Sequence, residues 1–231
     1  MNGYYRAFFL LTLAALASPV VSGAQETDDP YVWLEEVEGE RAMAWVTEQS
    51  DATLAAMRAH PVYDSIYGAT LAILESQDKI DYPTLRGDWI YNFWQDGEHE
   101  RGIWRRATVD SYLSGEPQWE TVLDIDALAE EESVPWAYHG AECLAPEYRL
   151  CLVNLSRGGS DASEVREFDV DARGFVEPGF FLPEAKSSAA WRGPDALLLT
   201  TDFGPGSLTQ SGYPRIAKLW RRGTPLDEAA V

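Results

Sequence analysis

Positively charged residues are scarce in this sequence. It contains 18 Lys and Arg residues against 38 Asp and Glu residues, which leaves a formal net charge of -20. A chain with this charge repels phosphate backbones and anionic lipid. We therefore expect no nucleic-acid partner, and we read the acidic excess as support for solubility.

Histidine and cysteine, the usual ligands of zinc, are also rare. The sequence has three histidines, His60, His99 and His139, and two cysteines. No two of the histidines have the close spacing of a zinc site, and neither cysteine belongs to a CxxC pair. We therefore expect no bound metal and no cofactor.

Long hydrophobic runs are missing after the first residues of the chain. The apolar run Ala7–Ala17 follows Arg6 and is too short to span a bilayer, and the small residues Ser22–Ala24 come after it. This pattern predicts a secretory signal peptide over residues 1–24 with cleavage after Ala24; cleavage after Gly23 and an uncleaved anchor are the alternatives. We expect an exported protein, periplasmic or secreted, with no membrane association after cleavage.

The rest of the sequence has the composition of a folded protein. Hydrophobic residues make up 45% and aromatic residues 12% of the 231 residues, while 18 Gly and 13 Pro are too few for a collagen-like or low-complexity chain. With 231 residues, the chain is long enough for one large domain or two modest ones.

Residues 28–75 show the periodicity of helices. Asp29 and Pro30 suit the start of a short helical turn, and apolar residues then recur every three or four positions from Ala42 to Met57. Pro61 interrupts the pattern, and a second helical stripe follows from Tyr63 to Leu74. The apolar stripe of the first helix needs a partner surface.

After Gln77 the period changes to that of β-strands. Short apolar runs alternate with Gly, Pro and Asp, which predicts an all-β module. The predicted strands are Trp89–Trp94, Ile103–Val109, Trp119–Leu123, Ala137–Leu144, Leu150–Leu155, Glu164–Val170, Ala189–Trp191, Ala196–Thr201 and Ile216–Trp220.

The spacing of these runs favours a β-propeller. Three segments, Arg86–Trp94, Pro146–Leu155 and Arg192–Thr201, each join a polar turn to an apolar strand and are followed by a Gly-containing loop and another strand. The period is roughly 45 to 60 residues, which is the length of a four-stranded propeller blade. The periodicity alone also allows a β-sandwich. About three blades fit between Lys79 and Arg222, too few to close a ring.

No pattern for nucleophilic catalysis is complete. The nearest approach to a G-x-S-x-G elbow is Gly158–Ala162, but its last position is Ala and a strand-like alternation follows Ser160 instead of a helix. A Ser-His-Asp triad would need one of the three histidines, and each of them fits a structural role in a helix end, a turn or a strand.

Two other charged segments carry weak signals. Asp169–Gly174 begins like a calcium loop, but Arg173 replaces a ligand and Phe180 stands where the bidentate Glu belongs, so we predict no calcium site. Arg215, Lys218, Arg221 and Arg222 form the one basic patch, which is either a solvated face or a docking surface for an acidic segment.

The two cysteines lie in a predicted hairpin. If its turn is centred on Pro146–Tyr148, Cys143 and Cys151 face each other across the two strands at a distance that a disulfide can bridge. Two buried thiols on neighbouring strands are the alternative, so the sequence leaves the disulfide possible and undecided.

Several motifs resemble the amino-terminal region of the prolyl oligopeptidase family. The segment Asp29–Glu36 (DPYVWLEE), followed by Ala44–Gln49 (AWVTEQ), resembles the opening of family members. The segments Leu155–Ala162 (LSRGGSDA), Val165–Asp169 (VREFD), Pro183–Lys186 (PEAK) and Ser211–Arg215 (SGYPR) extend the resemblance to the propeller region of exported bacterial members. Nearly all of the chain after residue 24 is covered.

The resemblance implies a serine endopeptidase in which a seven-bladed propeller caps an α/β-hydrolase domain and admits short proline-containing peptides. It also implies that residues 25–77 form a helical arm that packs on the hydrolase domain, and that residues 78–231 are a partial propeller. We expect the catalytic Ser, Asp and His beyond Val231, because no residue here matches a triad position, and we assign no catalytic residue.

We therefore predict a mainly β chain: a short α-helical arm followed by about three of the seven blades that the resemblance implies. As the amino-terminal portion of a prolyl oligopeptidase-like peptidase, it should be inactive alone, and its partners should be the hydrolase domain and short peptides. The alternative hypothesis is an exported β-propeller binding module without catalysis, which would fold as an independent monomer.

Overall fold

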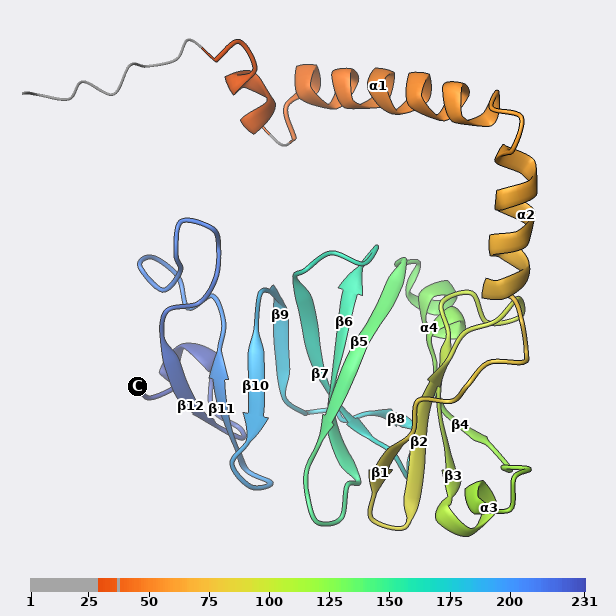
Figure 1. Ribbon diagram of the computed structural model, residues 1–231. Helices are drawn as coiled ribbons and strands as arrows, with labels where there is room; N and C mark the ends of the chain where they lie inside the picture. The colour runs from red at the N-terminus through yellow and green to blue at the C-terminus, as the bar shows by residue number, and fades with distance from the viewer. Residues whose placement is uncertain (1–28, 37) are drawn as a thin grey trace, which may run out of the picture. The chain divides into compact units, whose positions relative to one another are not determined.

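The computed structural model describes residues 29–36 and 38–231 (Figure 1). The predicted signal peptide, residues 1–24, lies outside this part. The chain divides into two compact units, with the boundary between Asp64 and Ser65. No helix in the described part is both long enough and apolar enough to cross a bilayer.

The first unit is helical. A 3₁₀ turn, η1 (Val32–Glu35), precedes the helix α1 (Glu40–Arg58), and the Asp29 carboxylate accepts a hydrogen bond from the N–H of Tyr31 at 2.8 Å just before the turn. Trp33 lies edge-on to Trp45 of α1, with ring centroids 6.0 Å apart. Both predicted elements are therefore present, and the turn packs on the helix that follows it.

A second helix, α2 (Tyr63–Leu74), begins two residues after Pro61. This position agrees with the predicted interruption, because proline cannot donate the backbone hydrogen bond of a helix interior. The carbonyl of Leu74 at the end of α2 accepts a hydrogen bond from Lys79 Nζ.

The second unit contains three antiparallel sheets, which we call blades 1, 2 and 3 (Figure 1). Neighbouring strands in each blade follow one another along the chain, except that β9 pairs with β7. Blade 1 consists of β1 (Thr84–Arg86), β2 (Trp89–Trp94), β3 (Ile103–Thr108) and β4 (Glu120–Asp124). Blade 2 consists of β5 (Trp136–Cys143), β6 (Leu150–Arg157), β7 (Ser163–Asp169), β8 (Gly174–Phe175) and β9 (Phe181–Ala185). Blade 3 consists of β10 (Ser188–Trp191), β11 (Ala196–Thr200) and β12 (Ala217–Arg221).

The repeat seen in the sequence is the repeat of the blades. The three segments that join a polar turn to an apolar strand end in β2, β6 and β11, the second strand of each blade, and the strands predicted to follow them are β3, β7 and β12. The fold is therefore mainly β, and the described sheets form part of a propeller and not a closed ring. Prediction of a partial propeller is confirmed.

The structure also contains elements that the sequence analysis missed. The helices α3 (Val109–Leu113) and α4 (Ile125–Glu132) follow strands of blade 1, and the side chains of Thr108 and Asp124 cap them by accepting N–H bonds at 3.2 and 2.9 Å. The strands β1, β8 and β9 were also missed. Most of these elements are too short for a helical or strand period to be visible in the sequence. The last element of the chain is a 3₁₀ turn, η2 (Leu226–Glu228).

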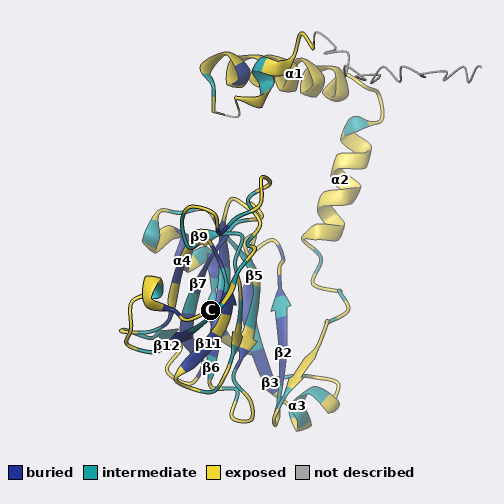
Figure 2. Cartoon of the chain, turned by 90° about the vertical axis from the view of Figure 1, so that its left-hand side faces the viewer, coloured by how far each residue is buried: buried dark blue, intermediate teal, exposed yellow. Residues whose placement is uncertain are grey.

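The core lies in the two seams between blades. One buried cluster joins blades 1 and 2 and includes Tyr91, Trp104, Val153 and Phe168. The other joins blades 2 and 3 and includes Leu197. Figure 2 shows buried residues along the strands and exposed residues along α1 and α2. Each blade is therefore stabilised mainly by its neighbour.

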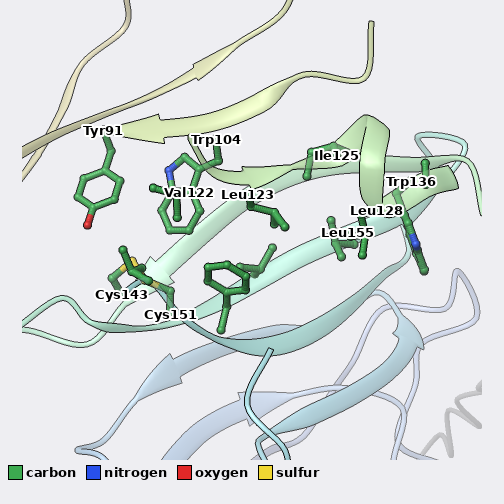
Figure 3. Packing of buried hydrophobic residues seen from close by; sticks show 14 residues of the cluster. Tyr91, Trp104, Val122, Leu123, Ile125, Leu128, Trp136, Cys143, Cys151 and Leu155 are labelled. Carbon is green, nitrogen blue, oxygen red and sulfur yellow. A yellow bond between two sulfur atoms is a disulfide. The ribbon is translucent and has the colours of Figure 1, made fainter. Parts of the chain in front are cut away.

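The cysteines lie at the edge of the first cluster. Cys143 of β5 is directly opposite Cys151 of β6 in the strand register, and the two sulfur atoms form a disulfide (Figure 3). Cys151 is fully buried and Cys143 nearly so. The bond therefore joins the two strands of the hairpin whose turn contains Pro146, and both cysteines belong to the buried cluster of the blade 1–blade 2 seam.

The disulfide predicts that the denatured but unreduced protein has no free thiol. Thiol titration in denaturant should detect none before reduction and two after it, and replacing both cysteines by Ala should lower stability by about 2 kcal/mol because the closed loop is short. Two free thiols before reduction would show the alternative, a pair of buried thiols.

Candidate functional site

The first strands of the blades lie closest to one another. β5 and β10 are in contact, and the indole of Trp191 in β10 donates a hydrogen bond to the carbonyl of Glu142 in β5 at 2.8 Å. On the other side, Arg86 of β1 donates to the carbonyl of Ala141 in β5, also at 2.8 Å. In a propeller the strands that approach most closely are those near its axis, so β1, β5 and β10 form the axial edge of this array.

A β-bulge interrupts β5 on this axial edge. The register shifts between Tyr138 and Ala141, and Gly140 lies at φ +113°, a conformation that favours glycine. His139 is exposed beside it, and its Nε2 lies 2.9 Å from Oγ of Ser156. Because Ser156 is fully buried, it cannot serve as a nucleophile for a substrate, and no carboxylate in the described part of the chain contacts His139.

Aromatic rings fill the seam between blades 1 and 2. Tyr138 of β5 stacks on Phe93 of β2, with centroids 4.6 Å apart, and lies 6.0 Å from Trp104 of β3, which in turn contacts Phe168 of β7. Burial raises the pKa of Tyr138 well above its usual value, although the nearby Arg86 opposes the shift. Tyr138 therefore stays a neutral phenol that contributes to packing.

A second contact crosses this seam through Arg106. Its guanidinium lies 4.0 Å from the ring centroid of Trp89, contacts Glu120 of β4 at 2.5 Å and reaches Asp171 of blade 2 at 3.3 Å. Arg106 thus joins an outer strand of blade 1 to the loop that follows β7.

The seam between blades 2 and 3 contains a buried ion pair. Both carboxylate oxygens of Glu167 in β7 accept hydrogen bonds from Arg222, each at 2.8 Å, and Glu167 also accepts the N–H of Phe180. The Glu167 side chain is only 1% exposed, whereas that of Arg222 is 29% exposed. The bond with Glu167 raises the pKa of Arg222, and its guanidinium also packs over the ring of Phe180 at 4.5 Å.

This pair changes the interpretation of the basic patch. Arg222 points into the seam and is not a member of a solvated or docking face, while Lys218 lies 4.4 Å from the ring centroid of Phe203. Arg215 and Arg221 are the remaining members, and Arg221 is exposed. The four side chains therefore do not form one basic surface.

Asp96 forms a second buried centre at the loop between β2 and β3. Its side chain is buried, with 6% of the residue exposed. Its carboxylate accepts hydrogen bonds from the indole of Trp94, the side-chain amide of Gln77 and the backbone N–H groups of Glu98 and His99. The ring of His99 lies 3.0 Å from the same carboxylate. Burial alone would raise the pKa of Asp96, but these bonds outweigh it and lower the pKa far below its ordinary value. This places His99, one of the three histidines, in a structural role.

The remaining catalytic and metal candidates are also occupied by structural contacts. Ser160 donates to the carbonyl of Ala162 in the loop after β6, and it contacts no histidine. In the calcium-like segment, Asp169 accepts two backbone N–H groups and pairs with Arg149. Within the described residues, no group of three His, Cys, Asp or Glu side chains is arranged to hold a metal ion.

One shallow pocket of about 300 Å³ opens at the crevice between blades 1 and 2. Its lining includes Phe93, Arg101, Pro135, Tyr138 and Gly159 and contains no serine, cysteine or histidine. The pocket therefore offers aromatic and polar surface, including the carboxylate of Glu100, but no serine or cysteine nucleophile.

Together, the sheets and their seams define a propeller-type β-domain whose described part carries no assembled catalytic centre. Comparison with protein families then places it. The family "Prolyl oligopeptidase, N-terminal beta-propeller domain" matches residues 17–231, and the chain belongs to this family.

Two curated relatives are peptidases without a characterised activity. The chain is 39% identical over 242 residues to the uncharacterized peptidase y4nA of Sinorhizobium fredii, covering 99% of this chain and 33% of the relative. It is 31% identical over 205 residues to the uncharacterized peptidase RP174 of Rickettsia prowazekii, covering 85% of this chain and 28% of that protein. The chain thus spans about a third of the length of the curated relatives it matches.

Solved structures agree with this fold. A post-proline cleaving enzyme from Rickettsia typhi matches with a TM-score of 0.79 and 31% identity, over 85% of this chain and 30% of that one. Oligopeptidase B from Leishmania major matches with a TM-score of 0.62 and 14% identity, over 87% of this chain and 27% of that one, which shows likeness of fold alone.

The sequence analysis missed the residues that hold the blades together. Glu167 and Arg222 are separated by more than a blade along the chain, so no local spacing relates them. The one available signal is that Glu167 lies two residues after Val165 in a predicted strand, on the same face as that apolar side chain. A buried glutamate in an otherwise apolar seam requires a cationic partner.

Breaking the Glu167–Arg222 pair should destabilise the protein by about 3 kcal/mol, because a buried carboxylate then loses its partner. Arg222→Ala, in the complete gene product that contains this chain, should lower the midpoint of urea unfolding followed by tryptophan fluorescence. The matched control is Arg221→Ala, an exposed neighbour that should change stability by less than about 0.5 kcal/mol. Equal effects of the two substitutions would contradict the role of the pair.

The lowered pKa of Asp96 predicts how its contribution to stability depends on pH. A carboxyl group whose pKa is depressed on folding stabilises the protein fully above its ordinary pKa of 3.8 and loses this effect as the pH falls below that value. Asp96→Asn should therefore cost about 1 to 3 kcal/mol at pH 5 and clearly less at pH 2. Unfolding curves at both pH values measure the loss of stability caused by Asp96→Asn, with the exposed Asp88→Asn as control. A loss that is larger at pH 2 than at pH 5 would contradict the prediction.

Proposed function

We propose that this chain is the amino-terminal, propeller-side portion of an exported serine endopeptidase that cleaves short proline-containing peptides. The observation that carries the proposal is the match to the post-proline cleaving enzyme from Rickettsia typhi, at 31% identity and a TM-score of 0.79. Family membership over residues 17–231 and two relatives described as peptidases support it.

In this proposal the chain limits access to the reaction and does not perform it. Acyl transfer needs a nucleophile, a base and an oxyanion hole in one place. In the described part of the chain Ser156, which contacts His139, is buried in a sheet. We therefore assign substrate selection by size to the blades and catalysis to residues outside this chain.

The exposed apolar surface of the first helix supports a hydrolase domain as partner. Along α1, Trp45 is 37% exposed, Leu54 41% and Met57 53%. Side chains of this kind at helical spacing gain stability when they pack on another surface. The hydrolase domain of the complete peptidase is the partner we propose for this helix.

The free face of blade 3 supports a further blade as the second partner. Ala190, Leu198 and Leu219 are opposite one another across β10, β11 and β12, and Leu198 is 51% exposed although it lies in the middle strand. A central strand with an exposed leucine is expected where another sheet packs. We propose that the next blade of the propeller covers it.

We also propose export to the periplasm or the medium. The support is the signal-like pattern over residues 1–24, together with the Cys143–Cys151 disulfide, since disulfides persist mainly in oxidising compartments.

The proposed function predicts activity in the complete gene product and none in residues 25–231 alone. The complete, exported protein should hydrolyse a short chromogenic peptide after proline, and a reagent specific for active-site serine should abolish this activity. Purified residues 25–231 should show no hydrolysis above the background of the buffer. The assay is release of the chromophore at matched protein concentration.

Two results would overturn the proposal. If residues 25–231 hydrolysed the peptide and the serine reagent stopped the hydrolysis, the assignment of catalysis to residues outside this chain would be wrong. If the complete gene product were inactive, and residues 25–231 formed a monomer that unfolded cooperatively, the binding module without catalysis would be the better description.

A further inference from the structure

The segment that joins α2 to β1 has an unusual combination of exposure and contact. We call residues Gln77–Tyr82 the linker. Ile80 is 86% exposed and Tyr82 85% exposed, so the apolar side chains of the linker do not hold it to blade 1. Within the described residues, no backbone–backbone hydrogen bond joins the linker to the rest of the chain. By these criteria alone the linker would be a free hinge.

Three polar side chains nevertheless hold the linker to blade 1. Gln77 donates its amide N–H to Asp96 at 3.0 Å, and Asp81 accepts from Arg105 of β3 at 2.8 Å. Between them, Lys79 Nζ donates to the carbonyl of Gln95 at 2.6 Å and also to the carbonyl of Leu74. The Lys79 ammonium thus connects the last residue of α2 to the end of β2.

The partners on blade 1 are fixed before the linker reaches them. Arg105 lies between the rings of Trp94 and Trp119, at 4.1 and 4.4 Å from their centroids, and also donates to Asn92 at 2.8 Å. Its side chain is only 11% exposed. A partner that is already rigid loses little entropy on making another bond, so each contact with the linker is strengthened.

Asp96 is fixed in the same way. Its carboxylate is held by the indole of Trp94 and by two backbone N–H groups of the β2–β3 loop, and Gln77 completes the set. Loss of Gln77 would leave a buried carboxylate oxygen with one donor fewer, which has a cost even though the other donors remain.

We propose that Gln77, Lys79 and Asp81 form a clasp that holds the linker on blade 1 as a fixed strut. The clasp attaches the carboxyl end of α2 to blade 1. The chain therefore cannot bend freely between α2 and β1 unless the three contacts break together. It is releasable, because it consists of side-chain bonds without a backbone ladder or an apolar contact. The inference stands apart from the proposed peptidase activity.

The test is limited trypsin digestion of the complete gene product, with cleavage after Lys79 as the readout. Trypsin needs the Lys79 side chain, which the clasp occupies, so cleavage requires release and its rate follows the open population. Gln77→Glu places a second carboxylate beside Asp96, and Asp81→Asn removes the charge that faces Arg105. Each should raise the rate of cleavage after Lys79 about fivefold or more, the effect of losing one hydrogen bond.

Two controls separate the clasp from general loosening. Asp78→Asn changes an exposed acidic residue of the same linker that has no side-chain contact with blade 1 in the described structure, and it should leave the rate unchanged. Asp88→Asn changes an exposed acidic residue of blade 1 outside the clasp, and it should also leave the rate unchanged.

The rate after Lys79 is compared with the rate after Arg192, a residue of blade 3. A rise confined to Lys79 in Gln77→Glu and Asp81→Asn supports the clasp. Equal rates in Gln77→Glu, Asp81→Asn and Asp78→Asn would overturn it, as would a rise that affects Lys79 and Arg192 alike.

Discussion

The packing of each twisted sheet on the next is the interaction on which this structure depends. A blade of three to five short strands buries too little surface to be stable alone, so its core lies in the seam with its neighbour. At the first seam Trp104 and Tyr138 supply broad aromatic contact, and at the second Phe180 and Trp220 do so. Arginines then cross both seams, because a guanidinium can pack on a ring and pair with a carboxylate at the same time.

The elements of the fold were predictable where a period extends over enough residues. All nine predicted strands exist, because β2, β6 and their equivalents alternate clearly, and both α1 and α2 follow apolar stripes that Pro61 separates. Short elements were not predictable in this way. The helix α3 occupies the end of a predicted strand at Val109, where the cap by Thr108 outweighs the β-branched residue that suggested a strand.

The features of the site were likewise predictable only where they belong to local motifs. The absence of a complete triad pattern could be read directly from Gly158–Ala162 and the three histidines, since these are local motifs. The bonds that matter in the structure are not local: Arg222 lies in a run of basic residues, and only the packing of blade 3 on blade 2 shows that it belongs to Glu167. Resemblance of sequence motifs identified the family, but it could not identify the partner of a single arginine.

Several of the few cations in this sequence are used inside the protein. Arg106, Arg166 and Arg222 lie in or against seams and Arg105 lies against blade 1, each paired with a carboxylate that it neutralises. Each such pair carries no net charge, so the charge of -20 is carried by the other Asp and Glu residues. The unpaired carboxylates give the protein a negative electrostatic field, while the ion pairs at the seams hold the blades in register.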